Sequence, residues 1–321
     1  MPRYPFLALG LTLLVAPFAR AGDPAEPLRN YPHKSFTASA SGTGARSYWI
    51  FEPAEPVPVK APVVVFHHGW LAVNPGVYGA WIEHLARSGR IVIFPKYQTE
   101  LTSPADFLPN SVASVLDALD VLETAPGRVR PDRERFAVIG HSAGGNLSVQ
   151  MAAVAEARGL PIPKAVVAVC PGEVRPLIEP PLSTIPADTL LAIAAASDDR
   201  IVGDCRAREI YAQATSLTTS RKKYVLYRSD RRGPTLLVAD HFAPTAGLAM
   251  LDTGHDLLFR CCVALEFVGD QHPWGVTQAL EELAKEAFRR LPVASALHED
   301  IEHMAILIDC TPKVMVLALD G

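Results

Sequence analysis

Short, continuous apolar runs recur along this chain, and they constrain its fold more than any other feature. After an early run at 47–51 they occupy residues 63–66, 91–94, 136–139, 166–169, 190–193 and 224–227. A strand covered on both faces is apolar throughout, whereas a half-exposed strand alternates. Apolar residues at helix spacing lie between the runs, at 112–122 behind Ser103-Pro104, after Gly145, at 206–214 and at 276–291. This alternation predicts a mostly parallel central sheet with helices on both faces.

The length of the chain fits one large α/β domain. Its 321 residues exceed what a small domain needs. We expect an N-terminal segment over 22–46, the α/β domain over 47–293 and a C-terminal extension over 294–321. Only a short, proline-rich connector at 172–188 separates two of the predicted strands, so we expect no large lid domain there.

The first 21 residues have the pattern of a secretory signal peptide. A basic start at Arg3 precedes an apolar run over 6–18, and Ala19-Arg20-Ala21 forms a small-x-small cleavage site. We expect cleavage after Ala21 and a secreted or periplasmic product without stable membrane insertion. The alternative is a retained N-terminal anchor, although the apolar run is short for a spanning helix.

The charge of the chain argues against one class of partner, nucleic acid, and its cysteine count leaves the disulfide pairing undecided. The net charge is −4, and the basic clusters are short, which argues against a nucleic-acid partner. The five cysteines are Cys170, Cys205, Cys261, Cys262 and Cys310. Because five is odd, at least one cannot pair within the chain. Cys205 could bridge to Cys261 or Cys262, or all five could be buried thiols. The oligomeric state stays open.

The stretch "FAVIGHSAGGN" at 136–146 predicts a nucleophilic serine. An apolar strand ends in Gly140-His141-Ser142-Ala143-Gly144, which fits the pattern G-x-S-x-G, and a helix follows. Small residues on both sides of Ser142 allow the tight strand-to-helix turn that exposes its hydroxyl. The N–H group of Ala143, at the start of the helix, would stabilise a developing oxyanion. A phosphate-binding turn would instead need G-x-G-x-x-G or a Lys-Ser/Thr pair.

A serine on such a turn needs a base and an acid, which follow it in the chain in the order acid, then histidine. The strand at 190–196 runs into Asp198-Asp199, at the sheet edge where ligands bind. We choose Asp199 as the acid and keep Asp198 as the alternative. For the base we choose His241, which ends the apolar run 236–239, with His255 as its rival.

The second oxyanion donor should come from the turn after the strand at 63–66. That strand runs into His67-His68-Gly69-Trp70, and we name the backbone N–H of Trp70 as the donor. His68 is expected to hold this loop. No third metal ligand accompanies the paired histidines, so we predict no metal there. Trp70, Tyr78 and Trp81 either line an open cleft or pack in the core.

These motifs together resemble the α/β-hydrolase superfamily. The matching stretches are "PVVVFHHGW", "GRIVIFPKYQ", "FAVIGHSAGGN", "AAASDDRIV" and "LLVADHFAP", and the resemblance covers about 48–291. It is nearest to an exported branch that includes chlorophyllases, dienelactone hydrolases and polyester-degrading cutinases. The resemblance implies cofactor-free hydrolysis of small-molecule or polymeric carboxylic esters. The doubled Asp198-Asp199 departs from the family pattern.

Two other functions remain open from the sequence. A peptidase or amidase would use the same Ser142, Asp199 and His241. A binding protein with this fold would need no catalysis, but such proteins usually lose one member of the triad, and all three are present here.

Overall fold

The computed structural model of this protein describes residues 31–174, 179–233, 235–245 and 248–253. Backbone contacts divide the chain into two units, 1–31 and 32–321, and every helix and strand below belongs to the second. The expected signal peptide at 1–21, the helix at 276–291 and the extension at 294–321 lie outside the described residues. So do His255, Cys261, Cys262 and Cys310. No helix in the described ranges has both the length and the apolar character needed to cross a membrane.

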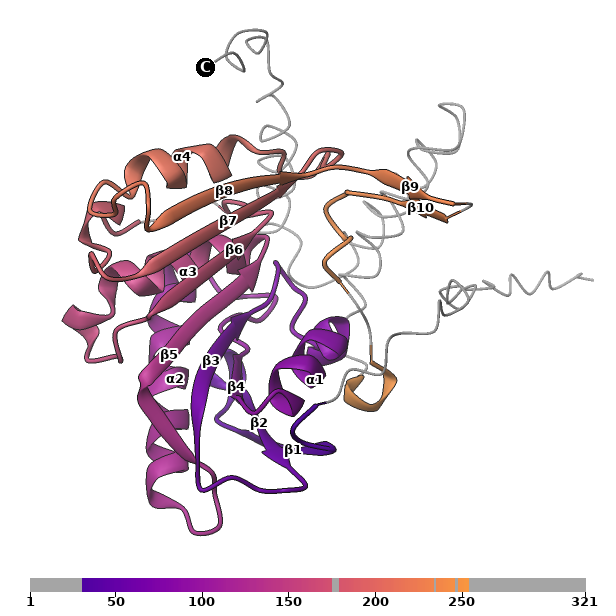
Figure 1. Ribbon diagram of the computed structural model, residues 1–321. Coiled ribbons are helices and arrows are strands. Elements are labelled where there is room, and N and C mark those ends of the chain that lie inside the picture. Colours follow the sequence, from indigo (N-terminus) through magenta and orange to yellow (C-terminus); the bar gives the residue numbers. More distant parts are fainter. Residues whose placement is uncertain (1–30, 175–178, 234, 246–247, 254–321) are drawn as a thin grey trace, which may run out of the picture. The chain divides into compact units, whose positions relative to one another are not determined.

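A mostly parallel sheet is the centre of the described fold (Figure 1). Eight strands of the described ranges follow the order β1-β2-β4-β3-β5-β6-β7-β8. β2 pairs antiparallel with β1 and β4, and the pairs from β4 across to β8 are parallel. The strands are β1 Ser35–Ser41, β2 Tyr48–Ala54, β3 Lys60–His67, β4 Ile91–Pro95, β5 Arg130–His141, β6 Ala165–Val169, β7 Leu190–Ala196 and β8 Lys222–Tyr227.

The apolar runs become strands because both faces of the sheet are covered. Val63 and Val65 of β3 point into one core, while Phe66 points into a second core on the opposite face. β1 is the exception: its sequence SFTASAS is polar and largely exposed at the edge of the sheet. It lies within 22–46, so the sheet begins ahead of the expected start at residue 47.

Helices cover the two faces unequally among the described residues. α2 (Phe107–Thr124), α3 (Ala143–Val154) and α4 (Cys205–Gln213) pack on one face, and α1 (Gly79–Arg87) packs on the other (Figure 1). The first face joins two apolar clusters through α3, because Met151 contacts one and Val149 contacts the other. The mixed coverage confirms the predicted α/β architecture.

The apolar run 236–239 does not add a strand to this sheet, contrary to the sequence-based expectation. β10 (Thr235–Leu237) pairs antiparallel with β9 (Asp230–Arg232) in a separate two-stranded hairpin. Gly233 has φ +61°, a conformation that glycine adopts without strain and that turns the chain back on itself. Leu236 and Leu237 therefore pair within the hairpin instead of beside β8.

The order of the strands creates a point where loops diverge. β3 lies between β4, which follows it, and β5, which comes later, so the chain leaves β3 and β5 toward opposite sides of the sheet. Ligands of open parallel sheets bind outside the carboxyl ends of strands at such a point. The loop that begins at His68 and the turn at Ser142 both start there.

Two glycines allow α3 to approach the sheet closely. A Cβ atom at Gly140 would lie 2.2 Å from the carbonyl oxygen of Gly144. A Cβ atom at Gly144 would lie 2.2 Å from the carbonyl oxygen of His68 and 2.3 Å from that of His67. Because the obstructing atoms are backbone, no side chain can move aside to make room.

We predict that Gly144→Ala lowers the free energy of unfolding by about 3 kcal/mol, as overpacking of a close contact does. Gly159→Ala is the control, because Gly159 has φ +71° but open space around its Cβ position. Its backbone strain alone should cost about 1 kcal/mol. Urea unfolding of both variants measures the difference, and equal losses would contradict the steric argument.

Candidate active site

Ser142 lies on a strained turn between β5 and α3. Its φ of 57° and ψ of −126° belong to a conformation that non-glycine residues rarely adopt. The N–H of Ser142 donates to the carbonyl of Val169 at 2.9 Å, and the carbonyl of Ser142 accepts N–H groups from Gly145, Asn146 and Gly172 at 2.9, 3.2 and 3.0 Å. These bonds fix the turn that G-x-S-x-G predicted.

A continuous hydrogen-bonded chain joins Ser142, His241 and Asp199. The Oγ atom of Ser142 lies 3.0 Å from Nε2 of His241. Nδ1 of His241 lies 2.7 Å from Oδ2 of Asp199. Asp199 and His241 are buried, whereas Ser142 is half-buried. Residues 42 and 57 positions apart in the sequence thus meet at the carboxyl edge of the sheet.

Asp199 is the carboxylate held for this contact. Its Oδ1 atom accepts the N–H groups of Ile201 and Val202 at 2.9 and 3.0 Å, leaving Oδ2 for His241. Burial opposes ionisation of Asp199, but the bond and charge of His241 and the two N–H groups outweigh it, so the pKa of Asp199 is lowered. Asp198 is exposed and bonds instead to Ser197 and Ser229.

His241 reaches the site on an irregular segment rather than at the end of a main-sheet strand. The N–H of Asp198 donates to the carbonyl of Ala239 at 2.9 Å, and the N–H of Ala239 donates to Oγ of Ser229 at 2.8 Å. The carbonyl of His241 itself lies 2.8 Å from Nε2 of His141. These bonds hold the segment where the sequence had suggested a strand.

The expected oxyanion donors lie on either side of Ser142. Ala143 is the first residue of α3, and its N–H has no hydrogen-bond partner among the described residues. The same holds, within the described ranges, for the N–H of Trp70. Trp70 follows Gly69, whose missing side chain lets the loop approach Ser142: a Cβ atom there would lie 3.3 Å from that of Ser142.

His68 holds this loop, as the sequence suggested. Nδ1 lies 2.6 Å from the carbonyl of Gly69, Nε2 lies 2.7 Å from that of Lys96, and the ring stacks on Tyr97 at 4.2 Å. Burial lowers the pKa of His68 to about 4, although the bonds to Gly69 and Lys96 act in the opposite direction. His67 bonds to Ser148 and Ser111 at 2.9 and 2.8 Å in the interior.

Trp70, Tyr78 and Trp81 differ in placement. The sequence did not decide whether they line a cleft or pack in the core. Tyr78 is completely buried and packs on Phe66 at 5.0 Å between ring centres. Trp81 is partly buried against the same core, and Trp70 packs against the apolar cluster of Tyr97 and Phe107. The ring of Tyr78 therefore belongs to the core rather than to a cleft, and its hydroxyl bonds to the N–H of Gly69 and to the ring of His141.

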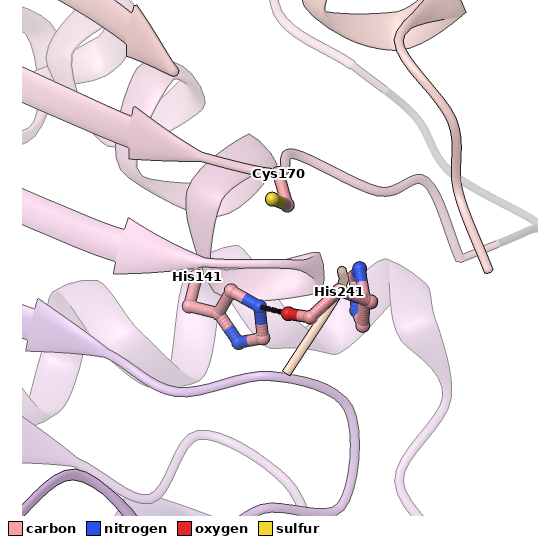
Figure 2. Close-up of side chains that lie close together, drawn as sticks. All are labelled: His141, Cys170 and His241. Carbon is pink, nitrogen blue, oxygen red and sulfur yellow. Dashed lines mark hydrogen bonds between the residues drawn. The ribbon is translucent and has the colours of Figure 1, made fainter. Parts of the chain in front are cut away.

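His141, Cys170 and His241 bring their ligand atoms within 4.8 Å of one another (Figure 2). Both ring nitrogens of each histidine already have protein partners, and Sγ of Cys170 lies 3.1 Å from the hydroxyl of Tyr227. Burial, and then the charge of Asp199, raises the pKa of Cys170 to about 12. A metal ion would have to break these contacts, so we assign no metal centre to this group.

Comparison with known families agrees with the fold. A family model described as alpha/beta hydrolase fold matches residues 63–239, more than half of the chain. The chain belongs to the α/β-hydrolase fold family. The match contains Ser142 and Asp199 and ends two residues before His241. This family is generally hydrolytic, so the fold indicates a hydrolase. The chain has no significant match among curated proteins.

Two groups near Ser142 make hydrogen bonds that the sequence did not predict. His141 stands inside the motif, and a polar residue at the end of a buried strand was a signal that it has a partner. Tyr78 gave no such signal, because a buried aromatic residue usually serves packing alone. The structure joins the two by a hydrogen bond of 2.9 Å.

Buried neutral histidines make the stability of this hydrolase depend on pH. Burial lowers the pKa values of His67 and His141 from 6.5 to about 3. Below pH 6.5 the unfolded chain therefore binds protons that the folded chain does not. The free energy of unfolding decreases as the pH is lowered from 6.5 to about 3. At pH 5 each histidine should cost about 2 kcal/mol relative to neutral pH.

Urea unfolding at pH 7.5 and pH 5 tests this prediction. The variant His67→Gln isolates one group, and its stability should change less between the two pH values by about 2 kcal/mol. An unchanged pH dependence in that variant would show that His67 does not resist protonation in the folded state.

Proposed function

We propose that the protein is a serine hydrolase of carboxylic esters, with Ser142 as nucleophile, His241 as base and Asp199 as the acid that orients the base. The observation that carries this proposal is the hydrogen-bonded chain of Ser142, His241 and Asp199, with distances of 3.0 and 2.7 Å. A nucleophile bonded to a base, which is bonded in turn to an orienting carboxylate, is the arrangement that activates a hydroxyl.

The two steps of the reaction follow from these contacts. His241 accepts the proton of Ser142 at Nε2 while the serine oxygen attacks the ester carbonyl. Asp199 keeps the remaining imidazole proton on Nδ1 and stabilises the imidazolium that forms. The imidazolium then protonates the departing alcohol. Water, deprotonated by the same nitrogen, attacks the acyl-serine. The bond to Oγ of Ser142 then breaks, the imidazolium returns its proton to that oxygen, and the carboxylic acid is released.

The N–H groups of Ala143 and Trp70 supply the oxyanion site in this proposal. Both lack a partner within the described ranges, and each belongs to a loop or helix start beside Ser142. An N–H that is already oriented at the developing negative charge needs no reorganisation during the reaction. Their position at the start of α3 and at the close approach of Gly69 supports this assignment.

We also propose that the protein belongs to the exported branch of esterases that its sequence resembles. The small-x-small site at 19–21 supports export, and the lipophilic or polymeric nature of the ester stays open. We place the protein in the secreted or periplasmic fraction after cleavage at Ala21. Sequencing the N-terminus of the mature protein checks this assignment directly.

We expect the protein to hydrolyse p-nitrophenyl esters and Ser142→Ala to lower kcat by about 10⁴-fold or more, since the nucleophile is lost. Esters of increasing acyl length would give the substrate range in the same assay. Thermal unfolding must show that Ser142→Ala is folded. If the wild-type protein hydrolyses amides but no ester, the ester assignment fails while the triad stands. Equal turnover in the wild-type protein and in Ser142→Ala would rule out Ser142 as the nucleophile.

The two adjacent aspartates provide a matched pair of variants. Asp199→Asn should lower kcat by about 10⁴-fold, because the imidazole then loses the group that fixes its tautomer. Asp198→Asn should retain activity within about threefold, because Asp198 is exposed, and asparagine keeps both the backbone N–H to Ala239 and a side-chain oxygen that accepts the Ser229 hydroxyl. Steady-state kinetics of the two variants decide the acid, and a larger loss in Asp198→Asn would reverse the assignment.

A further inference from the structure

A second hydrogen-bonded chain runs beneath the proposed triad. The N–H of Gly69 donates to the hydroxyl of Tyr78 at 2.9 Å. That hydroxyl lies 2.9 Å from Nδ1 of His141. Nε2 of His141 lies 2.8 Å from the carbonyl oxygen of His241 (Figure 2). The chain therefore connects the loop before Trp70, the residue before Ser142 and the backbone of the base.

The direction of every hydrogen bond in this chain is determined. The carbonyl of His241 can only accept, so Nε2 of His141 carries a proton. Burial lowers the pKa of His141 to about 3, which leaves the ring neutral and Nδ1 without a proton. Nδ1 therefore accepts from the Tyr78 hydroxyl, whose oxygen accepts the N–H of Gly69. Each of these polar groups has a partner although all are buried.

His241 needs such support more than the other two members of the proposed triad. Ser142 directly follows β5, and Asp199 follows β7 by three residues, so strands of the main sheet position both. His241 instead follows β10, which belongs to the separate hairpin. The ring of His141 lies 4.7 Å from the ring of His241, between centres, and its Nε2 bonds to the backbone of that same residue.

We propose that His141, oriented by Tyr78, is a positioning residue that holds the backbone of His241 so that its imidazole reaches both Ser142 and Asp199. The inference rests on the proposed function of the triad. Neither His141 nor Tyr78 exchanges a proton with the substrate. Their role is to fix the position of the His241 backbone relative to β5, because the segment that carries His241 is not itself a strand of the main sheet.

The decisive variants change the donor to His241 while keeping the rest of the site. In His141→Gln, the amide nitrogen reaches the place of Nε2 and still donates to the carbonyl. In His141→Leu, the donor is lost and a buried carbonyl is left without its partner. Tyr78→Phe removes the hydroxyl that orients the ring. Tyr48→Phe is the matched control, since it removes another buried tyrosine hydroxyl, bonded to Asp117 at 2.6 Å, away from the site.

On a p-nitrophenyl ester, His141→Leu should lower kcat by about 100-fold, as a displacement of about 1 Å in a reacting group does. We expect KM to stay within about twofold, because no substrate contact is lost. His141→Gln should recover most of the loss, to within about tenfold of wild type, and Tyr78→Phe should lose about tenfold. Tyr48→Phe should lose stability but no kcat. A loss in His141→Leu no greater than in Tyr48→Phe, or equal losses in the Gln and Leu variants, would overturn the proposal.

Nitrogen NMR of protein labelled with ¹⁵N-histidine tests the positioning without any ester. We expect His141 to be the neutral tautomer with its proton on Nε2, and the ring signals of His241 to shift in His141→Leu and Tyr78→Phe but not in Tyr48→Phe. Unchanged His241 signals in His141→Leu would refute the positioning role. If wild type hydrolyses no ester yet these shifts occur, the ester assignment fails and the positioning role survives.

Discussion

The backbone of Ser142 is held in a left-handed conformation, and the geometry of the site depends on that restraint. Such a conformation costs of the order of 1–3 kcal/mol in a non-glycine residue, so surrounding contacts must enforce it. The carbonyl of Ser142 accepts three N–H groups, from two residues of α3 and from Gly172, and its N–H bonds to the end of β6. One turn thereby fixes the distances among β5, β6 and α3. The absence of a side chain at Gly144 completes the arrangement, because α3 rests directly on the carbonyls of His67 and His68.

Burial around this turn fixes protonation states as well as positions. Asp199 stays ionised because its bonds outweigh the cost of burial. His141 and His67 stay neutral because no contact outweighs that cost, although at His141 the bond to the His241 carbonyl and the charge of Asp199 act against it. The Cys170 thiol keeps its proton for the same reason, strengthened by the nearby charge of Asp199. Among Asp199, His141 and Cys170, which lie near the His241 imidazole, only Asp199 therefore carries a negative charge. A single carboxylate behind the imidazole is the electrostatic arrangement that favours proton transfer from a hydroxyl.

The residues of this site differ in how strongly the sequence indicated them. Ser142 and Asp199 follow continuous apolar runs, so the pattern that predicts buried parallel strands also predicts where the carboxyl ends of those strands lie. The sequence favoured Asp199 but left Asp198 as an alternative, because the choice depends on which side chain turns inward to receive the N–H groups of Ile201 and Val202. The structure places His241 within hydrogen-bond distance of Ser142, but on a segment that follows a separate hairpin rather than a strand of the main sheet. Tertiary hydrogen bonds between residues about 100 positions apart, such as His141 to His241, leave no periodic signal.

The segment that carries His241 is a loop whose backbone is fixed by hydrogen bonds to the strands of the main sheet and to residues that directly follow them. It is bonded from three directions: the N–H of Asp198 after β7, the hydroxyl of Ser229 after β8, and the ring of His141 at the end of β5. Each donor or acceptor belongs to the first residues beyond a main-sheet strand or to the strand itself. The position of the loop is therefore set by three strands of one rigid sheet, although the loop adds no strand to it. Two of these bonds act on Ala239 and one on His241, so the backbone is held on both sides of Asp240, and the imidazole has little freedom except rotation about its own side-chain bonds. The contact with Asp199 removes that last freedom.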